Sequence, residues 1–419
     1  MKVLVLGAGV VGATTAYFLT RDGHAVTVVD RQSAPGQETS FANAAQISAC
    51  AAKPLAGPGI PWQSFKWMFQ KDSPLLLKPF RWDPALWTWG MRFLANCTAG
   101  RARTNIERSF RVALYSRTVL QSLRQFTNIQ YDQVLQGILH IYRTQDEFIA
   151  GQANAAVLKS LGLTQDILTP AECVKLEPAL DHAARDKLVG GLFSAGDESG
   201  DARKFTAEIA RLAEAQGAIF RFGETVERMD HDAHRVTRIM TDKGEYTPDA
   251  IVMALGSFSP LLARDLDLAL PVYPSKGYSI TVDIEKPKAA PTVSITDASR
   301  YMVFSRLGTR LRVAGTVELS GLNTYLDPVR VAPLIANARE LFPDASRYED
   351  VNPWCGLRPS TPDSVPIIGP TKYQNFFVNT GHGMLGWTMA CGSGRVIADL
   401  ISGRSPEIDL SGLTLDRYS

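Results

Sequence analysis

A glycine-rich loop near the N-terminus has the spacing needed to hold a dinucleotide. It runs Gly7-Ala8-Gly9-Val10-Val11-Gly12, follows the apolar run KVLVL (2–6), and precedes a predicted helix over 13–22. The first glycine permits a tight turn, the second lets backbone N–H groups approach a pyrophosphate, and the third lets helix and strand pack closely. Asp30 closes a second apolar strand (25–29), 23 residues after Gly7, where a carboxylate accepts hydrogen bonds from a ribose. The loop alone does not distinguish NAD from FAD.

Three further stretches extend this predicted site. Leu255-Gly256 ends a late strand, where a doubly wound sheet brings a glycine against the dinucleotide. Val226 precedes a predicted hairpin, and its backbone can face an adenine. A second glycine-rich loop begins a C-terminal helix, and a helix N-terminus suits a flavin that gains negative charge on reduction. The predicted contacts in this loop are Gly381, His382, Gly383, Leu385, Gly386 and Thr388. The alternative for this loop is an ordinary turn at the start of a helix.

The elements around these loops predict a two-domain α/β protein. A chain of 419 residues with 45% hydrophobic residues fits two domains. The N-terminal βαβ unit predicts a Rossmann-like, doubly wound domain, and residues 235–255 predict a hairpin with Lys243-Gly244 in its turn. We expect a discontinuous cofactor domain (1–50, 190–268 and 350–419) and an α+β substrate domain on an antiparallel sheet (51–189 and 269–349).

Composition narrows the classes of function. A net charge of +2 does not favour a nucleic-acid partner. Five cysteines lie far apart without a CxxC pair, which favours a reduced protein without a disulfide framework or metal site. Residues 1–30 fit a nucleotide-binding unit better than a signal peptide. The longest uncharged run, 373–394, is too polar for a membrane span.

Taken together, these segments resemble the D-amino-acid-oxidase superfamily of flavoproteins, and more closely the bacterial D-amino acid dehydrogenases. The resemblance covers nearly the whole chain. Its carrying stretches are VLGAGVVGATTAYFL, ETSFANAAQIS (38–48), FKWMFQ (65–70), TNIQYD (127–132), LPVYPSKGYSI (270–280), GLRPSTPDSVPIIG (356–369) and NTGHGMLGWTMACGSG (379–394). One departure is Ala45, where relatives have the glycine of an ANAGQ motif.

The resemblance implies non-covalent FAD and transfer of a hydride from Cα of a D-amino acid to flavin N5. The imino acid would hydrolyse to a 2-oxo acid and ammonia, and the electrons would pass to a quinone or another respiratory acceptor. It also adds expected cofactor contacts at Arg31, Ser40, Ala42, Asn43, Ala44, Gln46 and Gly356. Cys355 raises the alternative of covalent attachment, which we do not expect because the sequence shows no setting that favours a thiolate.

The substrate's carboxylate must be held in a fixed position by a residue that we call the clamp. Arginine suits this role because its guanidinium can form two parallel hydrogen bonds with a carboxylate. Arg358 occupies the arginine position of the GLRP motif and is our first candidate. Tyr278 and Tyr301 are candidates to complete the clamp, with Lys276 a weaker one. The period of a strand puts Lys276 and Tyr278 on one face, and 275, 277 and 279 on the other. No general base is predicted, and His382 is expected to contact the cofactor region instead.

A tryptophan-rich segment, 58–95, allows two interpretations. It contains Trp62, Trp67, Trp82, Trp87 and Trp89, with basic residues between them. One hypothesis is that part of it docks on the inner face of the bacterial inner membrane and admits a quinone to a cytoplasmic, peripheral protein. The other, which we favour slightly, is that these residues form the core of the substrate domain and a lid over the flavin.

Several functions remain open from the sequence. Within the enzyme class they are an amino acid oxidase, an L-amino acid deaminase, and a dehydrogenase of D-proline or hydroxyproline. A different class is a flavin-binding subunit that relays electrons within a complex.

Overall fold

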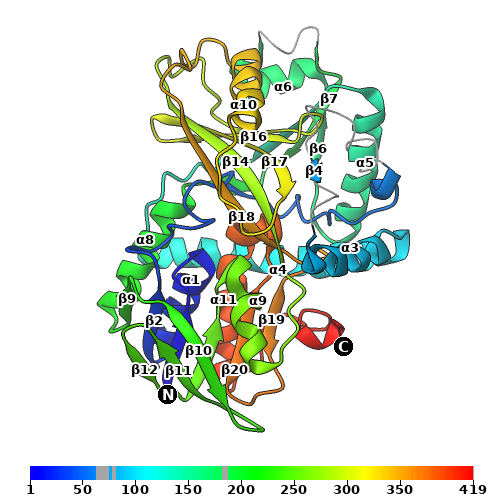
Figure 1. Ribbon diagram of the computed structural model, residues 1–419. Helices are drawn as coiled ribbons and strands as arrows, with labels where there is room; N and C mark the ends of the chain where they lie inside the picture. Colours follow the sequence, from blue (N-terminus) through cyan, green and yellow to red (C-terminus); the bar gives the residue numbers. More distant parts are fainter. Residues whose placement is uncertain (63–74, 78–81, 182–186, 419) are drawn as a thin grey trace.

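A computed structural model describes residues 1–62, 75–77, 82–181 and 187–418. Among these residues, six strands form a largely parallel sheet in the lower half of Figure 1. In spatial order they are β19 (Ile367–Pro370), β20 (Phe376–Thr380), β13 (Ala250–Met253), β1 (Lys2–Leu6), β2 (Ala25–Asp30) and β9 (Ile219–Phe222). Only the β19–β20 pair is antiparallel. The predicted βαβ unit and doubly wound sheet are confirmed.

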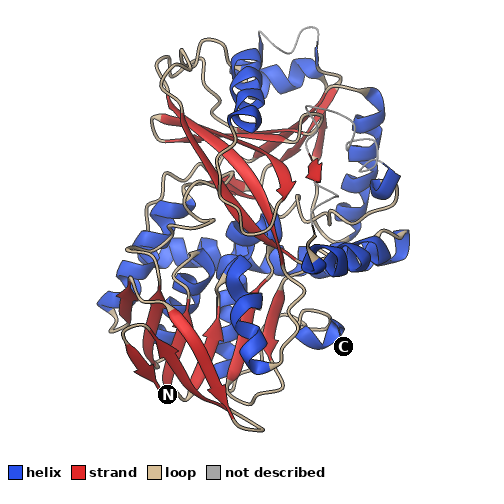
Figure 2. Ribbon diagram, in the orientation of Figure 1, coloured by secondary structure: helices blue, strands red, loops and turns tan. Residues whose placement is uncertain are grey.

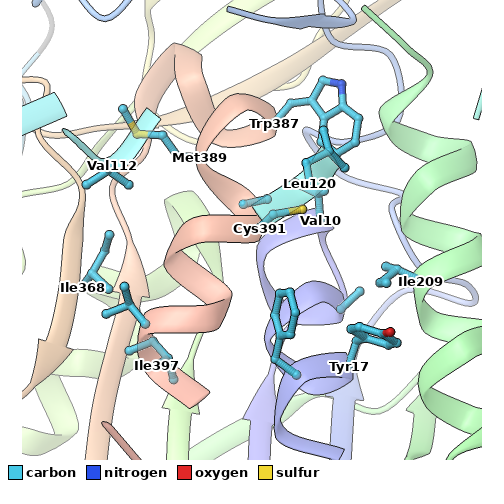
Figure 3. Packing of buried hydrophobic residues seen from close by; sticks show 14 of the residues in the cluster. Val10, Tyr17, Val112, Leu120, Ile209, Ile368, Trp387, Met389, Cys391 and Ile397 are labelled. Atoms are coloured by element: carbon cyan, nitrogen blue, oxygen red, sulfur yellow. The ribbon is translucent and has the colours of Figure 1, made fainter. Parts of the chain in front are cut away.

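Helices cover one face of this sheet. They are α1 (Val10–Arg21), α4 (Ala99–Thr127), α8 (Ala202–Ala215) and α11 (Gly386–Ile401). Alternate residues of β1 supply the two faces, since Val3 and Val5 pack toward the helices whereas Leu4 and Leu6 pack on the opposite face. Figure 3 shows the helix-side core, with Tyr17 of α1 and Trp387 of α11 among its buried side chains.

A small antiparallel sheet and a short helix cover the opposite face. The sheet consists of β10 (Val226–His231), β11 (Val236–Thr241) and β12 (Gly244–Tyr246), and the helix is α9 (Ser259–Ala263). Met229 and Ile239 from this sheet join the core made by Leu4 and Leu6. The predicted hairpin with its turn at Lys243-Gly244 is confirmed.

In the described part of the chain, nine strands form the second sheet, which lies in the upper half of Figures 1 and 2. Its path is β18 (Asn352–Ser360), β14 (Tyr273–Asp283), β17 (Arg310–Leu319), β16 (Met302–Leu307), β15 (Ser294–Asp297), β5 (Ile138–Tyr142), β7 (Gly190–Ser194) and β6 (Asp166–Leu168), with β4 (Leu75–Leu77) beside β17. Most neighbours are antiparallel, as predicted; β15–β5 and β17–β4 are parallel. Around it lie α3 (Pro84–Asn96), α5 (Gln145–Ser160), α6 (Pro170–Leu176) and α10 (Pro328–Leu341).

Three elements do not follow the predicted domain boundaries. β7 and β18 belong to the large sheet, although 190–268 and 350–419 were assigned to the cofactor domain. The helix α4, from the range 51–189, packs on α11 in the core of the cofactor half. β7 joins the large sheet by pairing with β5, and β18 joins it by pairing with β14. Because these partners are distant in sequence, neither segment carries a local signal of the sheet to which it belongs.

β18 therefore connects the two halves of the molecule. It pairs with β14 along its whole length, and the GLRP stretch at its end lies against the loop that follows β13. No helix in the described ranges is long and apolar enough to cross a membrane.

Candidate functional site

A cavity of about 970 Å³ lies between the two sheets. This is at the upper end of the volumes typical of cofactor and ligand sites. It is lined by most of the predicted cofactor residues: Gly7, Gly9, Val10, Val11, Asp30, Arg31, Ser40, Ala42, Asn43, Ala44, Gln46, Val226, Leu255, Gly256, Gly356, Arg358, His382, Gly383, Leu385, Gly386 and Thr388. Ala8, Gly12 and Gly381 do not line it.

The glycine loop has the geometry that its spacing predicts. Gly7 has φ +103°, which favours glycine, and a Cβ on Gly12 would lie 1.9 Å from the Gly7 carbonyl oxygen. Gly12 thus acts by close packing and not by lining the cavity. Asp30 accepts hydrogen bonds from the backbone N–H of Ala8 (2.6 Å) and of Gln32 (2.8 Å), which orient its carboxylate. Burial raises the pKa of Asp30, although these two hydrogen bonds oppose the shift.

One hydroxyl group and one side-chain amide can each still form a hydrogen bond to a ligand. Ser40 Oγ accepts the N–H of Val10 at the start of α1 (3.0 Å), so its own hydrogen can be donated into the cavity. The Asn379 side chain donates to Thr15 Oγ1 (3.1 Å), while its buried Oδ1 has no hydrogen-bond partner in the structure. An unpaired buried acceptor that lines the cavity suits the hydroxyls of a ribityl chain.

The part of the cavity near Val226, where the adenine is expected, contains a carboxylate that we did not predict from the sequence. Glu224 lines the cavity just before Val226, and its Oε1 accepts hydrogen bonds from Thr241 (2.7 Å) and Tyr246 (2.8 Å). Nearby, Arg31 pairs with Glu38, and its Cζ lies 3.9 Å from the ring centroid of Phe258.

The second glycine-rich loop reaches the cavity with a neutral histidine. His382 is 3% exposed, its Nε2 lies 3.1 Å from Ser393 Oγ, and burial lowers its pKa to about 3. Such an imidazole carries no charge at neutral pH. The helix α11 begins four residues later at Gly386, with its N-terminus at the cavity. This arrangement provides the positive end of a helix dipole rather than a histidine cation.

Arg358 of β18 brings a cation to the cavity. Its Nη1 donates to the carbonyl oxygen of Thr316 (3.0 Å), and no carboxylate among the described residues pairs with it. Burial lowers its pKa to about 10, which leaves it charged at neutral pH. A half-buried cation with unused donors, aimed into a cavity, is an anion site.

Lys276 and Tyr278 lie together on one face of β14, as predicted, but both contact a residue that the sequence analysis missed. Glu318 Oε2 accepts from Tyr278 OH (2.7 Å) and lies 3.2 Å from Lys276 Nζ, and all three side chains are buried. Burial raises the pKa of Tyr278, and Glu318 raises it further. The hydroxyl of Tyr278 is thus a donor already engaged, and Lys276 does not line the cavity.

From the other face of β14, Ser275 and Gly277 line the cavity, and Tyr278 lines it from the first face. Ser275 lies 2.5 Å from Ser360 Oγ, Ser279 donates to the carbonyl oxygen of Ala42 (2.7 Å), and Gly277 lies under Arg358. Tyr301 also lines the cavity, with φ +54° and 49% exposure, at its outer part. The substrate roles of Tyr278, Lys276 and Tyr301 stay predictions, whereas Arg358 lines the cavity with donors that no carboxylate of the described residues occupies.

A thiol–imidazole pair is another feature that the sequence did not predict. Cys50 Sγ lies 3.2 Å from His140 Nε2, and His140 lines the cavity. Burial lowers the pKa of His140 to about 4, although the charge of Asp197 opposes this, and burial raises the pKa of Cys50. Ninety residues separate the pair in sequence, which explains why no motif indicated it.

The tryptophan-rich segment divides between core and surface. Trp89 is buried and donates to the carbonyl oxygen of Ser360 (2.8 Å), whereas Trp67 lies outside the described residues. The outer part of the cavity is lined by exposed apolar side chains, which we call the apolar rim: Trp87, Met91 and Leu94 of α3, Leu261 of α9, and Met384. Burial of Trp89 agrees with the core interpretation, and docking of the exposed residues stays a prediction.

A dinucleotide cradle and a candidate anion clamp that line a single cavity are the features of a dinucleotide-dependent oxidoreductase. Residues 2–400 match the family model described as FAD dependent oxidoreductase. The chain belongs to this family, whose cofactor is FAD.

Relatives with high identity span the whole chain. A D-amino acid dehydrogenase of Paramagnetospirillum magneticum is 51% identical over 419 residues, covering 100% of this chain and 99% of the relative. One of Dechloromonas aromatica is 51% identical over 412 residues, covering 97% and 98%. The recognised resemblance is thereby confirmed.

Solved structures agree with the fold. Glycine oxidase from Geobacillus kaustophilus superposes with a TM-score of 0.78 at 22% identity, covering 99% of this chain and 97% of that one. L-proline dehydrogenase from P. horikoshii gives 0.75 at 17% identity, covering 100% and 97%. These likenesses establish the two-sheet architecture and no more.

Proposed function

We propose that this protein is a D-amino acid dehydrogenase that oxidises its substrate by FAD-dependent oxidative deamination. The observation that carries the proposal is Arg358, a charged side chain without a carboxylate partner in the described structure, which lines the same cavity as the dinucleotide cradle. The relatives that share about half of its residues over their full length are named D-amino acid dehydrogenases.

The cavity residues fit FAD. Asp30 would hold the adenosine ribose, Ser40 and the N-terminus of α1 the pyrophosphate, and Asn379 the ribityl chain. When bound, FAD accepts the hydride released from the substrate's Cα. We infer non-covalent binding because Cys355 is not among the residues that line the cavity; its Sγ lies 3.1 Å from the Thr324 carbonyl oxygen, and burial raises its pKa.

The protein's own part in the reaction is to bind and orient the substrate. Arg358 would hold the α-carboxylate through its unused donors, and this fixes the direction of the Cα–H bond. Its carbonyl partner at Thr316 prevents the guanidinium from rotating away. Hydride transfer requires a neutral amine and not a dedicated base, which agrees with the neutral state of His382.

For the acceptor, we propose a quinone or another respiratory carrier that approaches over the apolar rim. Five large apolar side chains exposed around one cavity mouth form a surface that suits an apolar partner or a lipid interface. A peripheral position on the inner membrane follows from this proposal.

The test is anaerobic bleaching of the flavin by a panel of amino acids. D-alanine and other D-amino acids should bleach it, whereas L-amino acids and D-proline should not. Rapid oxygen uptake with peroxide would favour an oxidase, and bleaching by L-amino acids or by D-proline would identify the corresponding rival enzyme. Absence of bleaching by any amino acid would leave the electron-relay subunit as the better account and would overturn the proposal.

A further inference from the structure

Two glycines that face each other on neighbouring strands form a flat floor in the cavity. Gly277 of β14 and Gly356 of β18 are register partners. A Cβ on Gly277 would lie 2.2 Å from Cζ of Arg358, and a Cβ on Gly356 would lie 2.0 Å from Cη2 of Trp354. The guanidinium and the indole therefore each lie directly on a glycine, in space that any other residue would fill.

The pairing of these glycines limits the separation of the two side chains. Cβ positions of directly opposed residues in an antiparallel pair are about 5 Å apart. With the close approaches at each glycine, the tip of the Trp354 indole lies within about 10 Å of Arg358 Cζ. An amino acid whose carboxylate is held by Arg358 can therefore extend its side chain onto Trp354.

The indole is supported from behind. Phe41 stacks on Trp354 with ring centroids 6.3 Å apart and planes at 25°, and Arg203 Cζ lies 4.1 Å from the Phe41 ring centroid. Successive layers of guanidinium, phenyl and indole restrict how far the Trp354 ring can move. A ring held in this way forms a fixed wall and not an adaptable contact.

The charges that line the cavity indicate which side chains this wall accepts. Among the described lining residues the carboxylates are Asp30, Glu38 and Glu224, and all three are engaged at the dinucleotide end. Beside Trp354, the charged group that lines the cavity is the guanidinium of Arg358. In this account the guanidinium already binds the α-carboxylate. A cationic side chain would find no partner there, and an anionic one would compete for the clamp.

We propose that Trp354 is a specificity-determining residue that binds the substrate's side chain and selects neutral, apolar D-amino acids. This inference rests on the proposed function, because it assumes that Arg358 holds the α-carboxylate. It adds a side-chain site that the sequence analysis did not identify.

The test compares substrates within one variant. For the wild-type holoenzyme, kcat/KM with D-phenylalanine should exceed that with D-lysine and D-glutamate. In Trp354→Ala, kcat/KM for D-phenylalanine should fall at least about tenfold more than that for D-alanine, since loss of an apolar contact of this size has such an effect on discrimination. Trp354→Phe, which keeps an aromatic ring on Phe41, should show a smaller change of the same sign and serves if the alanine variant does not fold.

Ligand binding gives a readout without turnover. Pyruvate and phenylpyruvate carry the same carboxylate with different side chains, and their binding is measured by titration of the flavin absorption spectrum. Trp354→Ala should weaken phenylpyruvate binding at least about tenfold while changing pyruvate binding and the FAD dissociation constant little.

Equal losses for both ligands, or weaker FAD binding with an unchanged preference, would overturn the inference and would place Trp354 against the cofactor. These titrations remain informative if no D-amino acid bleaches the flavin, so a failure of the proposed function can be distinguished from a failure of this inference.

Discussion

Gly277 lies directly beneath the guanidinium of Arg358, so that a single added methyl group would occupy the position of the clamp. The clash would be with Cζ, Nη1 and Nη2, at 2.2 to 2.4 Å. These three nearest atoms form the far end of a flexible side chain, which can move without a shift of the strand backbone. A substitution here should therefore displace the clamp and spare the fold.

We predict that Gly277→Ala raises KM for D-alanine by about 10- to 100-fold, because hydrogen bonds to a charged group contribute about 1.5–3 kcal/mol. The melting temperature should change little. Steady-state kinetics and thermal unfolding of the holoenzyme measure the two effects. Gly100→Ala in α4 is the control, since a Cβ there meets no atom within 4 Å. An unchanged KM in Gly277→Ala would show that Arg358 does not bind the carboxylate.

A second prediction concerns the buried Lys276–Glu318 pair. Burial alone would raise the pKa of Glu318, but the hydrogen bond from Tyr278 and the charge of Lys276 outweigh it and hold this pKa below its ordinary value. Glu318→Gln should lower the free energy of unfolding by about 3 kcal/mol, because it leaves a buried ammonium without its partner. Denaturant unfolding measures this loss.

The double variant Lys276→Met with Glu318→Gln is the matched comparison. Removing both charges should recover much of the stability, since two neutral residues avoid the unpaired charge. If the double variant is as unstable as the sum of the single variants, the pair does not act as a unit.

The comparison of sequence with structure shows which information is local. The glycine loop, Asp30 and the alternation along β14 each depend on neighbours within one element, and all three were predictable. Arg358 could be placed at the cavity because a short motif carried it. The wall made by Trp354, by contrast, requires knowledge that Gly356 faces Gly277 across two strands.

The features that the sequence did not reveal depend on register and distant pairing. Glu318 meets Lys276 because the register of β17 shifts between Lys276 and Tyr278, opposite Thr316, which has φ +60°. The place of β7 and of β18 is decided by partners that are distant in sequence. No periodicity within either segment encodes such a choice.

Ala45 occupies a backbone conformation that favours glycine, at the position where the resemblance predicts one. It has φ +64° and is 1% exposed. A non-glycine residue in this region costs about 1–2 kcal/mol. We predict that Ala45→Gly leaves the free energy of unfolding unchanged or raises it by up to about 1 kcal/mol, because relief of strain offsets the greater entropy of an unfolded glycine.

Ala16→Gly is the control for this prediction. Ala16 is buried within α1, where glycine costs about 1 kcal/mol relative to alanine. Thermal unfolding of both variants gives the comparison. Equal losses in the two would contradict the view that Ala45 is strained.

Two histidines with lowered pKa values predict how stability depends on pH. Burial lowers the pKa of His140 to about 4 and that of His382 to about 3, against about 6.5 in the unfolded chain. Below pH 6.5 the unfolded state binds protons that the native state does not, so stability is complete above this pH and is lost as the pH falls toward 4 and 3. Each histidine contributes up to about 1.4 kcal/mol per pH unit.

Melting temperatures of the holoenzyme between pH 7.5 and 4.5 test this prediction. The fall toward low pH should be shallower in His140→Gln than in the wild type. His234→Gln, at an exposed position, should keep the wild-type slope. Carboxylates contribute to the slope in all three proteins, and the comparison removes them. Parallel slopes in wild type and His140→Gln would contradict the lowered pKa of this imidazole.

The apolar rim predicts binding to a lipid surface. Trp87, Met91 and Leu94 lie on one side of α3 with exposed fractions of 47%, 73% and 55%. Each would lose contact with water on docking, and each such side chain contributes about 1.5 kcal/mol or more when fully buried. Replacing all three by serine should reduce flotation with phosphatidylglycerol-containing vesicles at least about tenfold, and should slow reduction of a membrane quinone while leaving bleaching by D-alanine unchanged.

A matched triple variant separates this effect from general surface apolarity. Phe126, Ile149 and Ile167 are as exposed, at 72%, 53% and 59%, but none of them lines the cavity. Serine at these three positions should leave vesicle binding and quinone reduction as in the wild type. Equal losses in both triple variants would mean that the contact is unspecific, and no loss in the α3 variant would assign these side chains to a lid over the cavity. Only a loss confined to α3 supports entry of the acceptor beside the flavin, because the same residues would then bind the membrane and line the path to the cofactor.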